Sequence, residues 1–238
     1  MAAEITRPPV CRFLAYLCRT DISHLEKTVL ECGAGGRYPP LALFYERGYR
    51  SYGIDISNGQ IERARSFCRD RDMRITLIKA DMRSIPFEDE SFSFVYECDS
   101  MCHLTKEDMS TAIKEMTRVL RKGGYCSVAF MTLDSWPLEG EERRPGQFWH
   151  CYQGEEYVHS YFEDDEPDQY FTDLDIVWKE KYTILYSDRM AKTSRKDWIE
   201  WYNNTWTHYS KEEWINLYDG RLERFRQSSL QYIAQKPP

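Results

Sequence analysis

The sequence lacks the features that would place the chain in a membrane or on an export route. No apolar run approaches the length that spans a bilayer, and the run from Leu41 to Tyr45 is among the longest. The first residues, Met1 to Arg12, have neither the basic stretch nor the apolar block of a signal peptide. These absences predict a cytoplasmic protein without a membrane span.

Basic residues are also fewer than acidic residues. The 238 residues include 32 Lys and Arg against 39 Asp and Glu, which gives a formal net charge of −7. A chain with that balance does not attract phosphate backbones or anionic membranes as a whole, so we expect no nucleic-acid partner. The eight cysteines include no CxxC pair, and in a chain without a signal peptide this pattern favours buried thiols over disulfides. The oligomeric state is left open.

The composition and the pattern of apolar runs predict one α/β domain. Hydrophobic residues make up 42% of the chain and charged residues 30%, so it can bury a sizeable core and still dissolve. Short apolar runs alternate with amphipathic stretches up to residue 131, which indicates a mainly parallel sheet with helices on both faces. The strands are expected at 28–32, 51–56, 74–79, 92–97 and 124–131, and the helices at 8–20, 38–48, 58–70 and 106–121.

The alternation ends after Met131. Residues 134–162 are heavily aromatic, and two interpretations stay open for them: a lid over an apolar or ring-shaped acceptor, or the ordinary core of an inserted subdomain. We interpret the whole chain, 1–238, as one domain. Its expected parts are a cofactor-binding core at 1–131, a substrate-side elaboration at 134–226 that includes a strand at 175–186 and helices at 193–226, and a closing strand at 229–236.

A glycine-rich turn follows the first predicted strand, in Glu31-Cys32-Gly33-Ala34-Gly35-Gly36. Glycines there let the chain turn tightly and let a ligand approach the backbone. Asp55 ends the second strand about 20 residues later, where a carboxylate can accept hydrogen bonds from both hydroxyls of a ribose. The third glycine of a dinucleotide fingerprint would fall at Tyr38, which argues against NAD or FAD.

Four segments, in this order, resemble the motifs of class I S-adenosylmethionine-dependent methyltransferases, and most closely their ubiquinone/menaquinone methyltransferase-like branch. Each segment alone is weakly specific, but together they cover residues 28–131. They are Val29–Gly36, the Asp55 segment GIDIS, Ala80-Asp81-Met82 with Ile85–Phe92, and Glu115–Gly124. The resemblance implies a Rossmann-like three-layer sandwich, with a seven-stranded, mostly parallel sheet whose last strand is antiparallel. It also implies S-adenosyl-L-methionine as cofactor and methyl transfer to a small molecule.

The resemblance further assigns the cofactor-binding residues near the first strand. Gly33, Ala34 and Gly35 would form the loop on which the methionine portion lies. Glu31 would contact its amino group.

The remaining cofactor residues would follow the next three strands. By the same resemblance, Asp55 would hold the ribose hydroxyls and Ile56 would pack on the adenine. Asp81 would accept from the adenine amino group, and Met82 would line the ring. Glu97, at the end of the fourth strand, would face the methyl donor.

Two side chains after the fourth strand are candidates for catalysis. Asp99 or His103 could take a proton from an acceptor hydroxyl or thiol, since a histidine titrates near neutral pH. The alternative for His103 is packing or capping of the next helix. Cys98, Cys102 and His103 cluster as soft metal ligands do, but no fourth ligand is nearby, so we expect no metal site.

Two other functions compete with methyl transfer. A nicotinamide-dependent oxidoreductase would share the glycine turn and the Asp55 carboxylate, but Tyr38 and Asp81 weigh against it. A non-catalytic subunit that binds S-adenosylmethionine would keep every cofactor motif. Transfer of another part of the cofactor, such as an aminopropyl group, has no supporting motif.

Overall fold

A twisted central sheet organises the molecule. The structure, a computed structural model, describes residues 7–136, 138, 140–152, 154–185 and 226–238, with isolated positions between 194 and 215. From one edge the strands run against the chain order to β1, then continue with β4 and β5, and β10 lies between β5 and β9. In spatial order the strands are β3 (Thr76–Lys79), β2 (Arg50–Asp55), β1 (Thr28–Cys32), β4 (Phe92–Glu97), β5 (Leu120–Thr132), β10 (Arg226–Gln235) and β9 (Asp175–Leu185).

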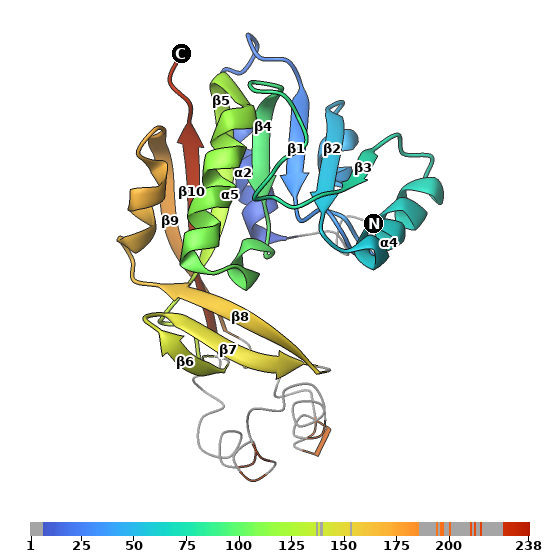
Figure 1. Cartoon of the computed structure of the whole chain (residues 1–238). Helices are drawn as coiled ribbons and strands as arrows, with labels where there is room; N and C mark the ends of the chain where they lie inside the picture. Colours follow the sequence, from blue (N-terminus) through green and yellow to red (C-terminus); the bar gives the residue numbers. More distant parts are fainter. Residues whose placement is uncertain are drawn as a thin grey trace.

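The first five of these strands are parallel, and β10 runs antiparallel to both of its neighbours. All five residues of β1 and all six of β4 are buried, as expected for parallel strands that are covered on both faces. Figure 1 shows β10 inserted between β5 and β9, with its arrow opposite to that of β1. The predicted Rossmann-like fold, with a mostly parallel sheet and an antiparallel last strand, is confirmed.

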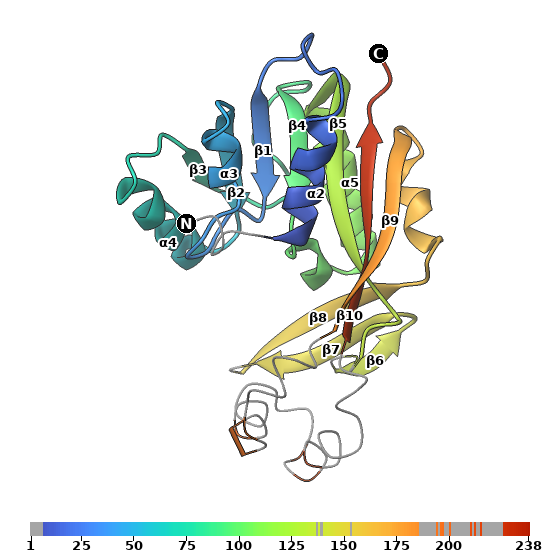
Figure 2. The same cartoon turned by 180° about the vertical axis from the view of Figure 1, so that it is seen from behind.

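Helices cover the two faces of the sheet. Three of them lie on one face (Figure 2): α2 (Pro8–Leu17), α3 (Ala42–Tyr45) and α4 (Asn58–Arg69). On the other face, α5 (Lys106–Val119) buries an apolar stripe of Met109, Ala112, Ile113, Met116 and Val119. These residues recur every three or four positions, so one side of the helix faces the core.

Local signals explain where the helices begin and end. Ser57 caps α4 by accepting from the backbone N–H of Gln60, and Thr105 caps α5 by accepting from that of Asp108. The helix predicted over 38–48 is wrong in extent, because only Ala42–Tyr45 is α-helical. Pro39 and Pro40 instead begin tight turns in which their carbonyls accept from residues three positions later. Gly48, at φ +80°, ends the segment.

The elaboration after β5 contains strands that the periodicity does not predict. They are β6 (Glu141–Arg144), β7 (Gln147–Tyr152) and β8 (Glu155–Phe162), and they form an antiparallel sheet, which we call the inserted sheet. Residues of β8 pair with the end of β5, so the inserted sheet continues from the central one. It lies beyond the carboxyl ends of the parallel strands (Figure 1). The helical stretch predicted over 193–226 falls almost entirely outside the described residues.

Candidate functional site

The turn after β1 folds back onto the end of β2. The N–H groups of Gly33 and Ala34 both donate to the carbonyl of Ile54, each at 2.8 Å. Gly33 has φ +89°, and a Cβ there would lie 2.1 Å from the hydroxyl oxygen of Ser100. The loop after β4 therefore packs directly on the glycine turn, and only glycine fits at this contact.

Asp55 fixes the next part of the same turn. Its Oδ2 accepts from the N–H of Gly35 at 3.0 Å, and its Oδ1 accepts from the N–H of Ser57 at 2.8 Å. A Cβ on Gly35 would lie 2.4 Å from that Oδ2. The acid predicted to bind a ribose thus adjoins the glycine loop, with its carboxylate half-buried and both oxygens held in place by backbone donors.

Ile56 follows this acid and is an exposed large hydrophobic residue, with 63% of its surface accessible. Water-exposed apolar surface beside a polar anchor suits a ligand that has a flat ring next to hydroxyl groups. The position of Ile56 is consistent with the adenine contact that the sequence predicts.

Asp81 reaches the same edge of the sheet, because the N–H of Ala80 donates to the carbonyl of Asp55 at 3.0 Å. Its carboxylate is already paired: the guanidinium of Arg83 donates to both oxygens, with the shortest distance 2.6 Å. These hydrogen bonds lower the pKa of Asp81, so it is ionised at neutral pH. Sequence reasoning missed Arg83, although a basic residue two positions after an acid is a signal for such a pair.

Arg83 also bridges to α5, since its guanidinium lies 3.1 Å from the carboxylate of Asp108. Met82, between the two paired residues, is half-buried against the core under α5. Any contact of Asp81 with an adenine amino group must therefore use an oxygen that Arg83 shares. That contact stays a prediction.

We call the glycine turn, Asp55 and Ile56 together the notch. Two carboxyl groups are buried beside it, those of Glu31 and Glu97, each only 1% exposed. Glu31 accepts from the N–H of Leu41 at 3.0 Å. Burial raises the pKa of Glu31 to about 8, and the nearby Glu97 adds repulsion. The hydrogen bond from Leu41 offsets part of this shift. At neutral pH Glu31 is therefore mostly protonated.

Glu97 joins the end of β4 to its neighbours. Its Oε1 accepts from the N–H of Ala129 at 2.9 Å, and its Oε2 accepts from those of Met101 at 3.1 Å and Ser100 at 3.3 Å. Burial raises the pKa of Glu97 to about 7, against these hydrogen bonds. Its side chain orders the loop that packs on Gly33. The predicted role beside the methyl donor stays a prediction.

The two catalytic candidates lie on that loop. Asp99 has φ +57°, an uncommon conformation for a residue other than glycine, and its side chain is 44% exposed. His103 lies in a short 3-10 helix, Met101–His103, and is exposed. The loop also carries Ser100, which contacts the glycine turn, so both candidates lie near the predicted methyl donor.

His103 contacts one histidine of the inserted sheet, His159, which in turn contacts a second, His150. The ring centroid of His103 lies 4.7 Å from that of His159, which lies 4.6 Å from that of His150. Both of the latter are 5% exposed. Sequence reasoning missed this stack, because the partners lie about 50 residues further along the chain and pack diagonally across a β-hairpin.

The fourth sequence motif, Glu115–Gly124, holds a neighbouring loop in place. Arg118 donates to the carbonyls of Ile85 and Phe87, each at 2.9 Å, and to the carboxylate of Glu115. Glu115 in turn accepts from the N–H of Ile85 at 2.8 Å. The motif therefore holds the loop before β4, and with it the edge of the sheet on which the notch is built.

Comparison with known proteins relates part of the chain to a known protein family. Residues 30–128 match the family described as "Methyltransferase domain". The chain is 34% identical over 113 residues to the methyltransferase GfsG of Streptomyces halstedii, across 47% of this chain and 40% of that protein. It is 32% identical over 120 residues to the 27-O-demethylrifamycin SV methyltransferase of Amycolatopsis mediterranei, across 49% and 43% of the two chains. The chain thus spans under half the length of these relatives.

The fold extends the likeness to nearly the whole chain. A solved structure of a SAM-dependent methyltransferase from Methanosarcina mazei superposes with a TM-score of 0.63 at 20% identity, covering 92% of this chain and 98% of that one. At that identity the superposition shows the fold. The predicted class is supported by residues 30–128, which are similar to the methyltransferase domain family.

Proposed function

We propose that this chain binds S-adenosyl-L-methionine between the glycine turn, Asp55 and Ile56, and transfers its methyl group to a small molecule. The observation that carries the proposal is the contact of Gly35 with Asp55, which joins the turn that a ligand can approach to the acid that can hold a ribose. The residues fit the cofactor: because Gly35 has no Cβ, the turn packs directly against the carboxylate of Asp55, and the exposed Ile56 follows that acid.

When bound, the cofactor supplies an activated methyl group: an acceptor electron pair forms the new bond to the methyl carbon, and the S–CH₃ electron pair stays on sulfur. The chain's own work is then alignment and exclusion of water, which can contribute up to roughly 7–11 kcal/mol. Gly33, Ala34 and Gly35 admit the methionine portion, with Glu31 and Glu97 beneath. Asp55 orients the ribose.

The other groups act at the two ends of the notch. Ile56 and Met82 flank the adenine, whose amino group donates to Asp81. At the methyl end, Asp99 or His103 takes the proton of an acceptor hydroxyl or thiol, if the acceptor has one to lose. The acceptor would lie along the edge where the inserted sheet meets the loop after β4, in line with the lid interpretation of residues 134–162.

The acceptor class is part of the proposal. One relative is named for methylation of an oxygen on a rifamycin, which supports a bulky small molecule with a hydroxyl group. The narrower likeness to ubiquinone and menaquinone methyltransferases rests on the sequence motifs alone. A cytoplasmic location and the absence of a nucleic-acid partner are likewise proposed from the sequence. Within the described part of the chain, no helix is both long and apolar enough to cross a bilayer.

The test is incubation of the purified chain with methyl-labelled S-adenosylmethionine and a metabolite extract. Mass spectrometry should find the label in one product or a few related products, and S-adenosylhomocysteine should accumulate. Tight cofactor binding without label transfer would instead indicate a non-catalytic binding subunit. Binding of NADH in place of S-adenosylmethionine would contradict the proposal.

A further inference from the structure

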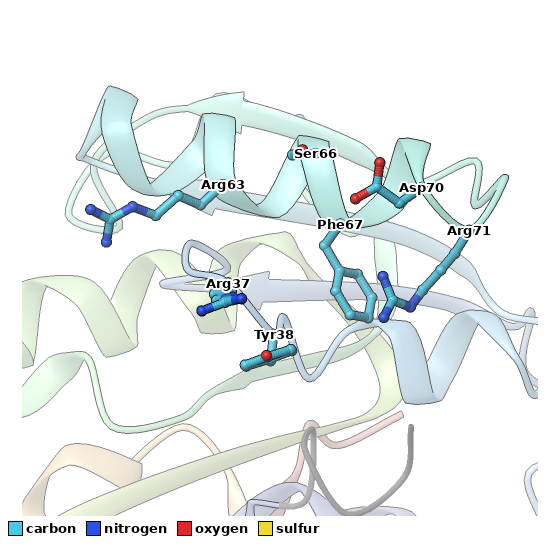
Figure 3. Close-up of a pocket in the computed structure, with 7 residues that line it drawn as sticks. All are labelled: Arg37, Tyr38, Arg63, Ser66, Phe67, Asp70 and Arg71. Carbon is cyan, nitrogen blue, oxygen red and sulfur yellow. The ribbon is translucent and has the colours of Figure 1, made fainter.

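A second concave surface lies away from the notch, between α4 and the chain that follows Gly36. We call it the α4 groove. It has a volume of about 600 Å³, within the range of small-molecule sites. Figure 3 shows Phe67 on α4, and Arg71 in the turn after it, pointing towards the segment that carries Arg37 and Tyr38. The groove is lined by Arg37, Tyr38, Arg63, Ser66, Phe67, Asp70 and Arg71.

The groove concentrates positive charge in an acidic protein. Arg37, Arg63 and Arg71 are all exposed, and none of them forms an ion pair with another described residue. Elsewhere in the chain most arginines have carboxylate partners, as Arg65 and Arg118 do. Three guanidinium groups face a single lining carboxylate, that of Asp70, so the groove attracts anions although the net charge is −7.

Aromatic rings hold two of the guanidinium groups. The guanidinium of Arg71 lies 3.8 Å from the centroid of the Phe67 ring, and that of Arg37 lies 5.5 Å from the centroid of Tyr38. The two rings pack edge to face, 6.1 Å apart. The cations are thus partly ordered before a ligand arrives, which lowers the entropic cost of binding.

The arrangement of donors in the groove favours an extended anion. Arg63 lies on α4, whereas Arg71 lies two residues beyond the end of that helix, and Figure 3 shows them at opposite ends of the groove. Ser66, three residues after Arg63 on α4, adds a hydroxyl donor. One carboxylate cannot reach guanidinium groups at both ends, whereas linked phosphates offer several oxygens with a longer reach, and guanidinium groups bind phosphate through paired hydrogen bonds.

We propose that the α4 groove is a binding site for a diphosphate-bearing small molecule. Arg63 contacts its phosphates from α4, Arg71 from the turn that follows α4, and Arg37 from the opposite wall. Tyr38 provides a ring surface for the part of the ligand next to the phosphates.

Occupancy of the groove would act on the cofactor notch, a step that rests on the proposed function. Arg37 directly follows Gly36, whose N–H donates to the carbonyl of Gln60 in α4 at 3.0 Å. An anion bound to both walls therefore holds the glycine turn against α4 in the observed conformation. Because coupling between two sites is reciprocal, the anion and S-adenosylmethionine would raise each other's affinity.

The binding step is tested with inorganic pyrophosphate as the probe, by calorimetry on the full chain at constant ionic strength and without S-adenosylmethionine. At that ionic strength we expect measurable binding that is at least tenfold weaker for the double variant Arg63→Gln/Arg71→Gln. In a second titration of the wild type at higher salt, binding should weaken. Arg69→Gln is the matched control, because Arg69 is exposed on the same helix but does not line the groove. Its affinity should equal that of the wild type.

Three results would overturn the proposal: no heat with the wild type, equal binding by the double variant, or equal binding of citrate, a carboxylate of similar charge. Thermal melts check that the double variant folds. If its stability falls, Arg37→Gln in the loop replaces it and should show the same loss. Since the probe contains no methyl donor, failure of methyl transfer and failure of this site give separate results.

Discussion

The backbone N–H of Gly35 donates to Oδ2 of Asp55 at 3.0 Å, and this bond joins the first glycine turn to the second strand. The carboxylate has a second backbone donor at Ser57. Each oxygen keeps a further lone pair for a ligand hydroxyl. The Asp55 side chain therefore orders the glycine turn and also presents negative charge to a ribose. Substitutions can separate its effect on the turn from its effect on ligand binding.

Asp55→Asn keeps the size of the side chain and one acceptor oxygen but removes the charge. We expect the Kd for S-adenosylmethionine to rise about 10- to 100-fold, because hydrogen bonds to a charged group are worth about 1.5–3 kcal/mol. Calorimetry measures the affinity. Asp72→Asn is the control, since Asp72 is exposed after α4 at φ +51°, which asparagine tolerates. An unchanged Kd for Asp55→Asn would remove the ribose assignment.

Gly35→Ala should disrupt the same contact by size. The added Cβ would lie 2.4 Å from both Asp55 Oδ2 and Gln60 Cβ, so the loop must shift, at a cost of about 1–3 kcal/mol. Thermal melts should show lower stability, and cofactor binding should weaken in parallel. Gly59→Ala in α4 is the matched control: its Cβ would meet only Ser57 at 3.9 Å, and alanine favours a helix. Equal behaviour of the two variants would contradict the steric argument.

Glu31 predicts a pH dependence of stability. Its pKa is raised by burial from 4.5 to about 8 in the folded chain, so the native state binds more protons than the unfolded state between those values. The free energy of unfolding contributed by this group therefore falls as the pH rises from about 4.5 to about 8. Glu31→Gln removes the titration and can still accept from Leu41.

The measurement for Glu31 is a series of thermal melts at pH 5 and pH 8. The Tm of Glu31→Gln, relative to that of the wild type, should be higher at pH 8 than at pH 5. Glu26→Gln serves as a control, because Glu26 is exposed and lies in surface ion pairs. A constant difference at both pH values would mean that Glu31 does not take up a proton on folding.

His103→Gln separates a proton acceptor from a packing residue. If His103 takes the acceptor proton, kcat should fall by about 10²-fold or more while the Kd for S-adenosylmethionine is unchanged. His24→Gln is the control, since His24 is exposed and lies near Gly123 of β5, not near His103. A matched loss of cofactor affinity and stability, with kcat retained, would assign His103 to the stack with His159 alone.

The features that could be predicted from the sequence are those encoded by neighbouring residues. The glycine turn, the apolar runs of β1 and β4 and the stripe on α5 each have a local pattern, and the family motifs place Asp55 and Asp81 at one edge. The pairing of Asp81 with Arg83 was missed because an acid that matches a ligand motif was treated as free.

The inserted sheet shows what local patterns miss. All four residues of β6, Glu-Glu-Arg-Arg, are exposed, so no apolar alternation signals a strand. In β8 the last five residues are buried without alternation, because they pack against both the central sheet and β7. The contact of His103 with His159 depends on that packing and has no signal in the sequence.

Ser160 links the inserted sheet to the loop after β4 and allows a test of what that sheet does. Its hydroxyl, fully buried, donates to the carbonyl of Leu104 at 2.7 Å, next to His103. Ser160→Ala leaves that carbonyl without this donor, which costs about 1–3 kcal/mol and should lower the Tm by about 2–10 °C for a chain of this size. Because no described contact joins Ser160 to the glycine turn or Asp55, the Kd for S-adenosylmethionine should be unchanged.

If the inserted sheet forms one wall of the acceptor site, the KM of the Ser160→Ala variant for the acceptor found by labelling should rise severalfold. Ser91→Ala, which removes a serine-to-carbonyl bond at an exposed position, should change neither constant. A lower Tm with an unaltered acceptor KM would show that the sheet only supports the fold at this point, and the acceptor would then have to bind elsewhere along the edge.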